Sequence, residues 1–235
     1  MENYVRINKF IASNGIISRR KVDEYIEQGR ITVNGITVRE RGFKVNPIKD
    51  KIGVDGEIIK TNVRKIYIVL NKPPKVISAV TDNKNRKTVV DLVKIKERIF
   101  PIGRLDYDTT GLILLTNDGE LANKLMHPKY EVDKIYLVHL SKPLNEKHRE
   151  KISDGIFIDR KKTEPAKISF VNKYDNKKIY VSIHEGRNRQ VKKMFEEFGY
   201  KIKKLHRTKY GNLKLGNLKE GGWRNLSKEE VAQFN

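Results

Sequence analysis

Polar residues that could carry chemistry stand beside apolar stretches in three places of the sequence. Asp106 lies in "IGRLDYDTTGLILLTNDG", where a polar turn separates Gly-Arg-Leu from a strongly apolar run. Tyr136 lies in "DKIYLVHL", and the third place is the block "HEGRNRQVKKMF" that begins at His184. Asp106 could be a reactive carboxylate, or it could only shape a turn, because aspartate side chains bond to nearby backbone amides. Asp108, two residues later, fits the turn role better.

The other two places also have explanations that need no chemistry. Tyr136 alternates with Ile135 and Leu137, as a core or cross-strand tyrosine would. In the basic block, Gly186 ends a predicted strand and a helix is expected from about Asn188. A solvated helix face would explain the cations there, but positive charge at a helix N-terminus opposes the helix dipole. These cations are Arg187, Arg189, Lys192 and Lys193.

Several common catalytic machineries are missing from the sequence. It has no cysteine, which excludes disulfides, thiolate zinc sites, cysteine nucleophiles and the zinc-dependent base deaminases. It also has no phosphate loop, no dinucleotide fingerprint, no G-x-S-x-G elbow and no paired histidines at metal-binding spacing. We therefore expect neither a cofactor nor a metal.

The composition indicates a polyanionic partner. The 235 residues include 50 Lys and Arg against 29 Asp and Glu, for a formal net charge of +21. Self-repulsion at that charge opposes compactness, so nucleic acid is the expected partner. The N-terminal residues lack the apolar core of a signal peptide, and no stretch reaches transmembrane length. We therefore expect a cytoplasmic protein that does not enter a membrane.

Residues 1–60 predict a small basic unit of two helices and a hairpin. The helices lie in "VRINKFIASNG" and "SRRKVDEYIEQG", and Asn34-Gly35 in "RITVNGITV" is a strong hairpin signal. Three cations occupy the first turn of the second helix. A solvated helix end would explain them, but they oppose the helix dipole there, which favours a bound anion. They are Arg19, Arg20 and Lys21.

The rest of the chain predicts a mixed, mainly antiparallel α+β domain. From Ile66 onward, strand patterns such as "IYIVLNKP", "GLILLTN" and "KIYVSIHEG" outnumber the helical patterns between them, and several pair as hairpins. After residue 60 there are 38 Lys and Arg against 21 Asp and Glu, so this domain is expected to contact the polyanion too.

Together the motifs resemble the pseudouridine synthases of the RsuA type, in the branch that acts on large-subunit (23S) ribosomal RNA. The similar stretches are "KPPKVISA", "GRLDYDTTGLILLTNDGELANKLMHPKYEVDKIY", "HEGRNRQVKKMF" and "KLHRTKYGNLKLGNLKEGGWRNLSKEEV". The resemblance covers nearly the whole chain in family order. It implies an S4-type RNA-binding domain at 1–61, tethered flexibly around 61–65, and a catalytic domain at 62–235. That domain would have a long, mainly antiparallel sheet and a central cleft.

The resemblance also implies an activity, the site-specific isomerisation of uridine to pseudouridine in ribosomal RNA. Asp106 would attack the flipped-out uridine at the sugar C1′ or at the base C6, and the sequence leaves both routes open. The uracil would detach, rotate and rejoin the sugar through C5, with no cofactor, metal or energy source. Unstacking the base costs a few kcal/mol, which contacts around the nucleotide must offset.

By the same resemblance, Tyr136 would stack on the target base and could assist removal of the C5 proton. Arg187 would pair with Asp106, which keeps a nucleophilic carboxylate ionised. Arg104 would contact phosphate or help to displace the base. The chain departs from the family pattern at Lys75, where glycine is common, so we expect a different turn there. The expected RNA-binding residues are Arg19, Arg20, Lys21, Arg104, Arg189, Gln190, Lys192 and Lys193.

Two other functions fit parts of the sequence. A non-enzymatic S4-type RNA-binding or ribosome-assembly factor suits the composition equally well. A protein that only binds RNA would gain nothing, however, from a carboxylate in a basic cleft, because the carboxylate repels phosphate. An RNA methyltransferase would need a glycine-rich donor loop, which is missing. We therefore expect a monomeric enzyme whose partner is large-subunit rRNA or an assembly intermediate.

Overall fold

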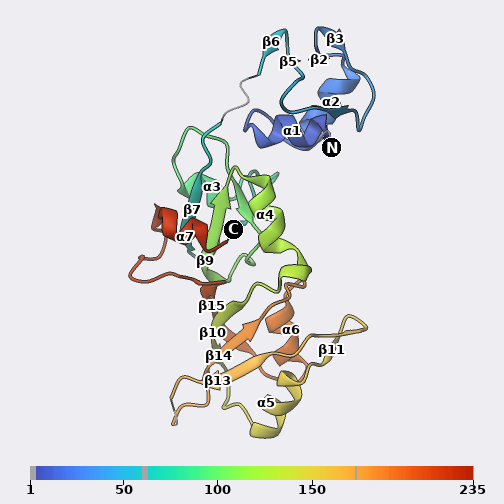
Figure 1. Ribbon diagram of the computed structural model, residues 1–235. Coiled ribbons are helices and arrows are strands. Elements are labelled where there is room, and N and C mark those ends of the chain that lie inside the picture. Colours follow the sequence, from blue (N-terminus) through green and yellow to red (C-terminus); the bar gives the residue numbers. More distant parts are fainter. Residues whose placement is uncertain (1–3, 60–62, 173, 235) are drawn as a thin grey trace. The chain divides into compact units, whose positions relative to one another are not determined.

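The computed structural model describes residues 4–59, 63–172 and 174–234 (Figure 1). The chain forms two compact units. The first contains residues 1–66 with 95–99 and 117–119, and the second contains 67–94, 100–116 and 120–235. The predicted boundary between residues 61 and 62, and part of the predicted tether, fall outside the described residues.

The first unit contains the two predicted helices and the predicted hairpin. Ser18 caps the second helix by accepting a hydrogen bond from the Lys21 N–H at 3.2 Å. Asn34 and Gly35 both have positive φ, 53° and 84°, as a two-residue type I′ turn requires. The elements are α1 (Ile7–Ser13), α2 (Arg19–Glu27), a sheet of order β3 (Ile36–Thr37), β2 (Ile31–Val33), β5 (Ile52–Val54), β6 (Glu57–Ile58), and the pair β1 (Val5–Arg6) and β4 (Lys44–Val45).

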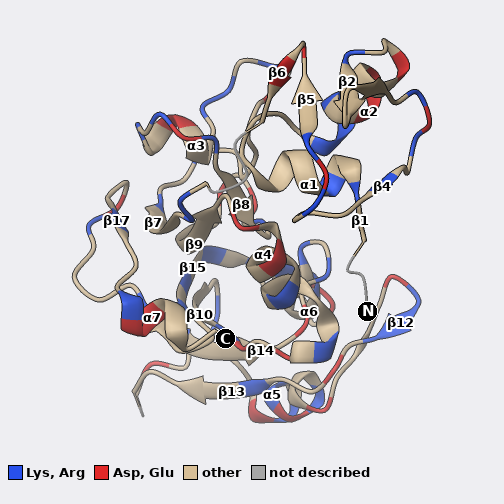
Figure 2. Cartoon of the chain, turned by 45° about the horizontal axis from the view of Figure 1, so that its top comes forward, with Lys and Arg blue, Asp and Glu red and all other residues tan. Residues whose placement is uncertain are grey.

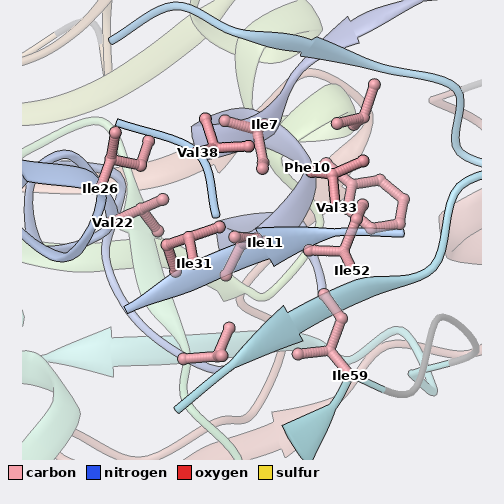
Figure 3. Packing of buried hydrophobic residues seen from close by; sticks show 12 residues of the cluster. Ile7, Phe10, Ile11, Val22, Ile26, Ile31, Val33, Val38, Ile52 and Ile59 are labelled. Carbon is pink, nitrogen blue, oxygen red and sulfur yellow. The ribbon is translucent and has the colours of Figure 1, made fainter. Parts of the chain in front are cut away.

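One apolar core holds this unit together (Figure 3). Ile7 and Ile11, four residues apart on α1, are both fully buried, as are Val22 and Ile26 on α2. The same spacing on both helices presents one apolar stripe to the sheet, where Ile31 is also fully buried. The cations Arg19, Arg20 and Lys21 lie on the exposed face of α2 and are not part of this core.

The second unit is built on one large sheet, whose strands are antiparallel except at one pair. Its order is β13-β14-β10-β15-β9-β7-β17, with β16 added to β15 and β8 added to β9. The parallel pair β15–β9 is joined by only two residue pairs, His206 with Thr110 and Arg207 with Gly111. The strands are β7 (Tyr67–Lys72), β8 (Phe100–Ile102), β9 (Thr110–Thr116), β10 (Lys134–Leu140), β13 (Lys167–Phe170), β14 (Lys178–Ile183), β15 (Ile202–Tyr210), β16 (Leu213–Lys214) and β17 (Trp223–Asn225).

Burial differs along this sheet in a way that the sequence pattern explains. Every residue of β9 is buried, which matches its continuous apolar run. In β10 and β14 burial alternates: Tyr136 and Val138 are buried, whereas Ile135 and Leu137 are half-buried. Alternate side chains of a strand lie on opposite faces. This part of the sheet therefore has one covered face and one open face.

Short helices and one further hairpin complete the second unit. They are α3 (Val89–Leu92), α4 (Gly119–Met126), the 3₁₀ turn η1 (Pro128–Tyr130), α5 (Glu146–Ser153), α6 (Gln190–Glu196), α7 (Lys228–Ala232) and the hairpin of β11 (Phe157–Ile158) with β12 (Lys161–Lys162). Figure 2 shows Lys and Arg residues on α6, β12 and β15. No helix in the described ranges is both long and apolar enough to span a bilayer.

The loop that follows β7 turns at Lys75. Lys75 has φ +61°, the left-handed conformation that glycine favours, so a lysine here adopts the backbone of a glycine position. Its N–H donates to the Tyr107 carbonyl at 2.7 Å. This bond ties the loop after β7 to the loop that carries Asp106.

Candidate active site

Asp106 lies in the loop between β8 and β9, and hydrogen bonds fix this loop on both sides. The Ser78 hydroxyl accepts from the Leu105 N–H at 3.0 Å and donates to the Leu105 carbonyl at 2.8 Å. On the other side, the Thr109 N–H donates to the Asp106 carbonyl at 3.1 Å. Leu105 is buried, so it anchors the loop while the Asp106 side chain keeps 28% of its surface exposed.

Lys72 adds a cation beneath the same loop. It is fully buried at the end of β7, and its Nζ donates to the carbonyls of Thr109 at 2.9 Å and Pro73 at 3.0 Å. Burial lowers the pKa of Lys72 to about 8, although the charges of Asp108 and Asp106 oppose that shift. Lys72 therefore holds the backbone after Asp106 and places a positive charge near both acids.

The cation beside Asp106 is Lys192, which lies in the first turn of α6. Its Nζ is 3.5 Å from Asp106 Oδ2 and 2.6 Å from Asp108 Oδ1, and the lysine side chain is only 7% exposed. Burial tends to raise the pKa of Asp108, but the hydrogen bond and charge of Lys192, together with smaller contributions that include the charge of Arg189, lower that pKa overall. The buried ammonium of Lys192 thus forms ion pairs with both carboxylates.

The predicted pair of Arg187 with Asp106 is not formed in the structure. The Arg187 Nη1 donates to the Lys161 carbonyl at 3.0 Å, and Nη2 donates to the Ile158 carbonyl. These acceptors belong to the β11–β12 hairpin, and several carbonyl oxygens in one turn suit the fixed fork of a guanidinium. Lys192 takes the place beside Asp106 because it lies on the buried side of α6.

Tyr136 lies on β10 and is backed by a buried arginine that the sequence interpretation overlooked. Arg207 Nη1 is 3.5 Å from the Tyr136 hydroxyl, and its guanidinium carbon is 5.0 Å from the Tyr210 ring centre. Arg207 Nε donates to the Leu112 carbonyl at 2.7 Å. The buried Nη2 has no hydrogen-bond partner within the described residues. Arg207 is 2% exposed, so an under-bonded cation lies behind Tyr136.

Gly111 makes room for this arginine. A Cβ at that position would come within 2.3 Å of the Arg207 carbonyl oxygen, and its φ of +107° also disfavours other residues. The signals for this part of the site were present in the sequence. Lys72 and Ser78 lie in "KPPKVISA", and Arg207 lies in "KLHRTKYG". Only their packing shows which side chains are buried.

Two of the expected RNA-binding residues lie inside the protein. Gln190 is 3% exposed; its Oε1 accepts from the Arg187 N–H at 3.0 Å and its Nε2 donates to Glu185. Its amide is therefore fully used in shaping the start of α6. Lys192 is buried against acids, as described above, so neither residue presents a group to surface phosphates.

The remaining expected RNA-binding residues are exposed or partly exposed. Arg104, Arg19 and Arg20 are exposed and form no ion pair with another described residue. Lys21 pairs with Glu24 at 2.6 Å, Arg189 with Glu196 at 3.3 Å, and Lys193 with Asp159 at 2.5 Å. In the described ranges no cluster of three His, Asp or Glu residues is arranged to hold a metal.

The fold and these motifs define a class of protein. Residues 66–197 match the RNA pseudouridylate synthase family, and residues 5–52 match the S4 domain. The chain belongs to the RNA pseudouridylate synthase family, in its RsuA-type branch with an N-terminal S4 domain. The predicted family, α+β fold class and enzyme class are thereby confirmed, and the assembly-factor alternative is not favoured.

Two relatives and one solved structure are similar to nearly the whole of this chain. The chain is 48% identical to "Ribosomal large subunit pseudouridine synthase B" of Bacillus subtilis (strain 168), over 97% of this chain and 95% of the relative. It is 39% identical to "Dual-specificity RNA pseudouridine synthase RluF" of Escherichia coli (strain K12), over 99% and 79%. A solved structure, "Crystal structure of pseudouridylate synthase", is 31% identical with TM-score 0.72 and covers 98% of this chain and 100% of its own.

Proposed function

We propose that this protein isomerises a specific uridine of large-subunit ribosomal RNA to pseudouridine, with Asp106 as its nucleophile. The observation that carries the proposal is the position of Asp106, in a loop fixed by hydrogen bonds and beside the buried Lys192. The printed name of the Bacillus subtilis relative supports the large subunit as the source of the RNA.

The reaction balances without any added group. The Asp106 carboxylate attacks either C1′ of the sugar or C6 of the base. The C1′–N1 bond breaks, and its electron pair leaves with the uracil. The ring turns in place until C5 faces C1′, the C5–C1′ bond forms and the carboxylate is released. Loss of the C5 proton and protonation of N1 then give an isomer of the starting nucleotide.

The surrounding side chains suit this sequence of steps. The ammonium of Lys192 lies 3.5 Å from Asp106 Oδ2, where its positive charge would stabilise the carboxylate as it is released from the nucleotide. Tyr136 is 8% exposed in this structure and would stack on the flipped base once the nucleotide enters the site; its hydroxyl, 3.5 Å from Arg207 Nη1, would assist removal of the C5 proton. Arg207 lies behind that tyrosine, where its positive charge favours the electron-rich uracil over the neutral nucleoside.

Binding to the RNA is assigned to both units. Arg19 and Arg20 are exposed in the first turn of α2, where phosphate would neutralise both the cations and the positive end of the helix. Arg104 is exposed two residues before Asp106 and would contact the phosphates that flank the target. We propose that the enzyme acts as a monomer, in the cytoplasm beside its rRNA.

Tritium release tests this function directly. Large-subunit rRNA that carries tritium at uridine C5 is incubated with the wild type, with Asp106→Asn and with the control Asp154→Asn. Asp154 is an exposed acid at the end of α5. Release by the wild type and the control, but not by Asp106→Asn, is the expected result, and the modified position is then mapped. Absence of release from rRNA and from partly assembled subunits would overturn the proposal.

A further inference from the structure

The open face of the large sheet carries a cavity that the proposed reaction does not use. It has a volume of about 590 Å³, within the range of small-ligand sites. Ile135 and His206 contribute to its wall. These residues are the strand neighbours of Tyr136 and Arg207, so their side chains project from the opposite face of the sheet. The cavity is therefore separate from the site around Tyr136.

Two lysines at this cavity form a cross-strand pair of like charge. Lys209 on β15 is directly opposite Lys214 on β16 in the antiparallel register, and both line the cavity. Like charges in that position destabilise a strand pair. Neither lysine forms an ion pair with a carboxylate of residues 4–59, 63–172 or 174–234. A bound anion would relieve this repulsion.

The rest of the lining suits a nucleobase rather than a bare anion. Tyr180 lines the cavity and keeps 38% of its surface exposed, so one face of its ring is available for stacking. Asn71 also lines it and is only 6% exposed, and its Nδ2 donates to the Leu218 carbonyl at 2.8 Å. That bond fixes two lining residues of the cavity, Asn71 and Leu218, to each other.

His206 adds a neutral polar group to the same wall. Burial lowers its pKa, and the charge of Lys204 acts in the same direction, whereas the charge of Glu220 opposes them. Its Nδ1 is 2.8 Å from the Thr110 hydroxyl, which fixes the ring. A neutral imidazole held in this position can hydrogen-bond to the edge of a base. The negative charge that acts on His206 is that of Glu220.

From these observations we propose that the cavity binds one unpaired nucleotide of RNA, with its base against Tyr180 and its phosphate between Lys209 and Lys214. The inference rests on the proposed function in one respect, since it takes RNA as the partner. It adds a second contact for the strand, on the face of the sheet away from Tyr136. This contact would hold a single-stranded part of the RNA apart from the target uridine.

Photo-crosslinking tests the site with a defined probe. The probe is hexaadenylate with one 8-azidoadenosine, which contains no uridine and so cannot be a substrate. Mass spectrometry then identifies the crosslinked peptides of the full-length protein. We expect crosslinks at Tyr180, Lys209 or Lys214, which line the cavity. Crosslinks found only at other residues, including Arg207 and Tyr210 on the opposite face, would overturn the proposal.

Affinity measurements with matched variants give a second criterion. Removing two phosphate contacts with Lys209→Gln/Lys214→Gln should weaken hexaadenylate binding about tenfold at low salt. Tyr180→Ala should weaken it about fivefold or more, through lost stacking. The control Lys201→Gln/Lys203→Gln removes the same charge from exposed residues outside the cavity lining and should change binding less than about twofold. Equal losses in the two lysine pairs would reject the cavity as the site.

Tritium release from rRNA separates this proposal from the proposed function. If wild-type protein releases tritium but the probe crosslinks elsewhere, the cavity proposal fails and the enzyme assignment stands. If the probe crosslinks at Tyr180 while no rRNA releases tritium, the cavity stands as an RNA contact and the enzyme assignment fails.

Discussion

The ammonium of Lys192 lies 3.5 Å from the carboxylate of Asp106 and is almost completely buried there. The same ammonium donates to Asp108 at 2.6 Å, so the shorter and stronger contact belongs to the acid that is not the proposed nucleophile. Asp108 therefore positions the Lys192 side chain. Asp106 also lies near the positive charge of Lys192, but at a longer distance. Lys192 contacts Oδ2 of Asp106, which leaves Oδ1 for attack on the nucleotide.

Replacing Lys192 with methionine should lower kcat for pseudouridine formation by about 100-fold or more, the usual cost of losing a charge-stabilising group. The side chain keeps a similar volume, so a large change in folding is not expected. Lys192→Arg should recover part of the activity. Tritium release under single-turnover conditions measures both, with the exposed Lys151→Met as the matched control. Near-normal kcat in Lys192→Met would remove this lysine from the mechanism.

Arg187→Ala should act mainly on the β11–β12 hairpin. Its guanidinium bonds to backbone carbonyls of that hairpin, and losing such contacts costs about 1–3 kcal/mol of stability. Unfolding in urea measures this cost, while kcat should fall much less than in Lys192→Met. If kcat instead falls as far as in Lys192→Met with unchanged stability, Arg187 has the charge-stabilising role that the sequence suggested.

Arg207→Met should lower kcat about tenfold or more while leaving a folded protein, because Arg207 pairs with no described carboxylate and its loss leaves no buried charge without a partner. Arg207→Lys should restore part of the rate. In a double-mutant cycle with Tyr136→Phe, we expect the two losses to be less than additive, since both remove the same pair. Fully additive losses would show that Arg207 acts independently of Tyr136.

Lys72 should make the stability of the protein depend on alkaline pH. Its pKa is about 8 in the folded state, below its ordinary value of 10.5, so between these values the unfolded chain binds more protons. Relative to Lys72→Met, the wild type should therefore gain stability as pH rises through this window, by about 1.4 kcal/mol per pH unit at most. Below pH 8 the difference should be constant. Urea unfolding of both proteins from pH 7 to 10 measures it, and a flat difference would contradict the prediction.

The two exposed arginines of α2 should determine part of the salt dependence of RNA binding. Arg19→Gln/Arg20→Gln should reduce the slope of log K against log salt by about 1.5–2, the amount for two lost phosphate contacts. Arg41→Gln removes a cation that is already paired with Glu27, so its slope should stay near that of the wild type. Filter binding to the rRNA substrate over a salt series gives the slopes. Identical slopes in all three proteins would exclude α2 from the interface.

Much of the fold could be predicted because local signals agreed with the final structure. The Asn34-Gly35 turn, the Ser18 cap and the alternating pattern of β10 each specify their element within a few residues. The site was predictable only in part. The sequence places Arg187 and Lys192 five residues apart, and nothing local decides which of them contacts Asp106. That choice depends on where α6 begins and on a hairpin almost thirty residues earlier in the chain. Gln190 looked like a surface contact for the same reason.

The large sheet has a junction with few residue pairs where β15 lies parallel to β9. Only two residue pairs connect the strands that follow Asp106 to the strand beside Tyr136, whereas β10 and β14 are connected by six. Asp106 precedes β9 on one side of this junction. Tyr136 lies on the other side, on β10, which is the next strand after β15. Along the path β13-β14-β10-β15-β9-β7-β17, this junction has the fewest residue pairs, and it separates the proposed nucleophile from the proposed stacking ring. Any bend of the sheet at this junction would therefore change the gap between them, and an RNA bound on both sides of the junction would set the width of that gap.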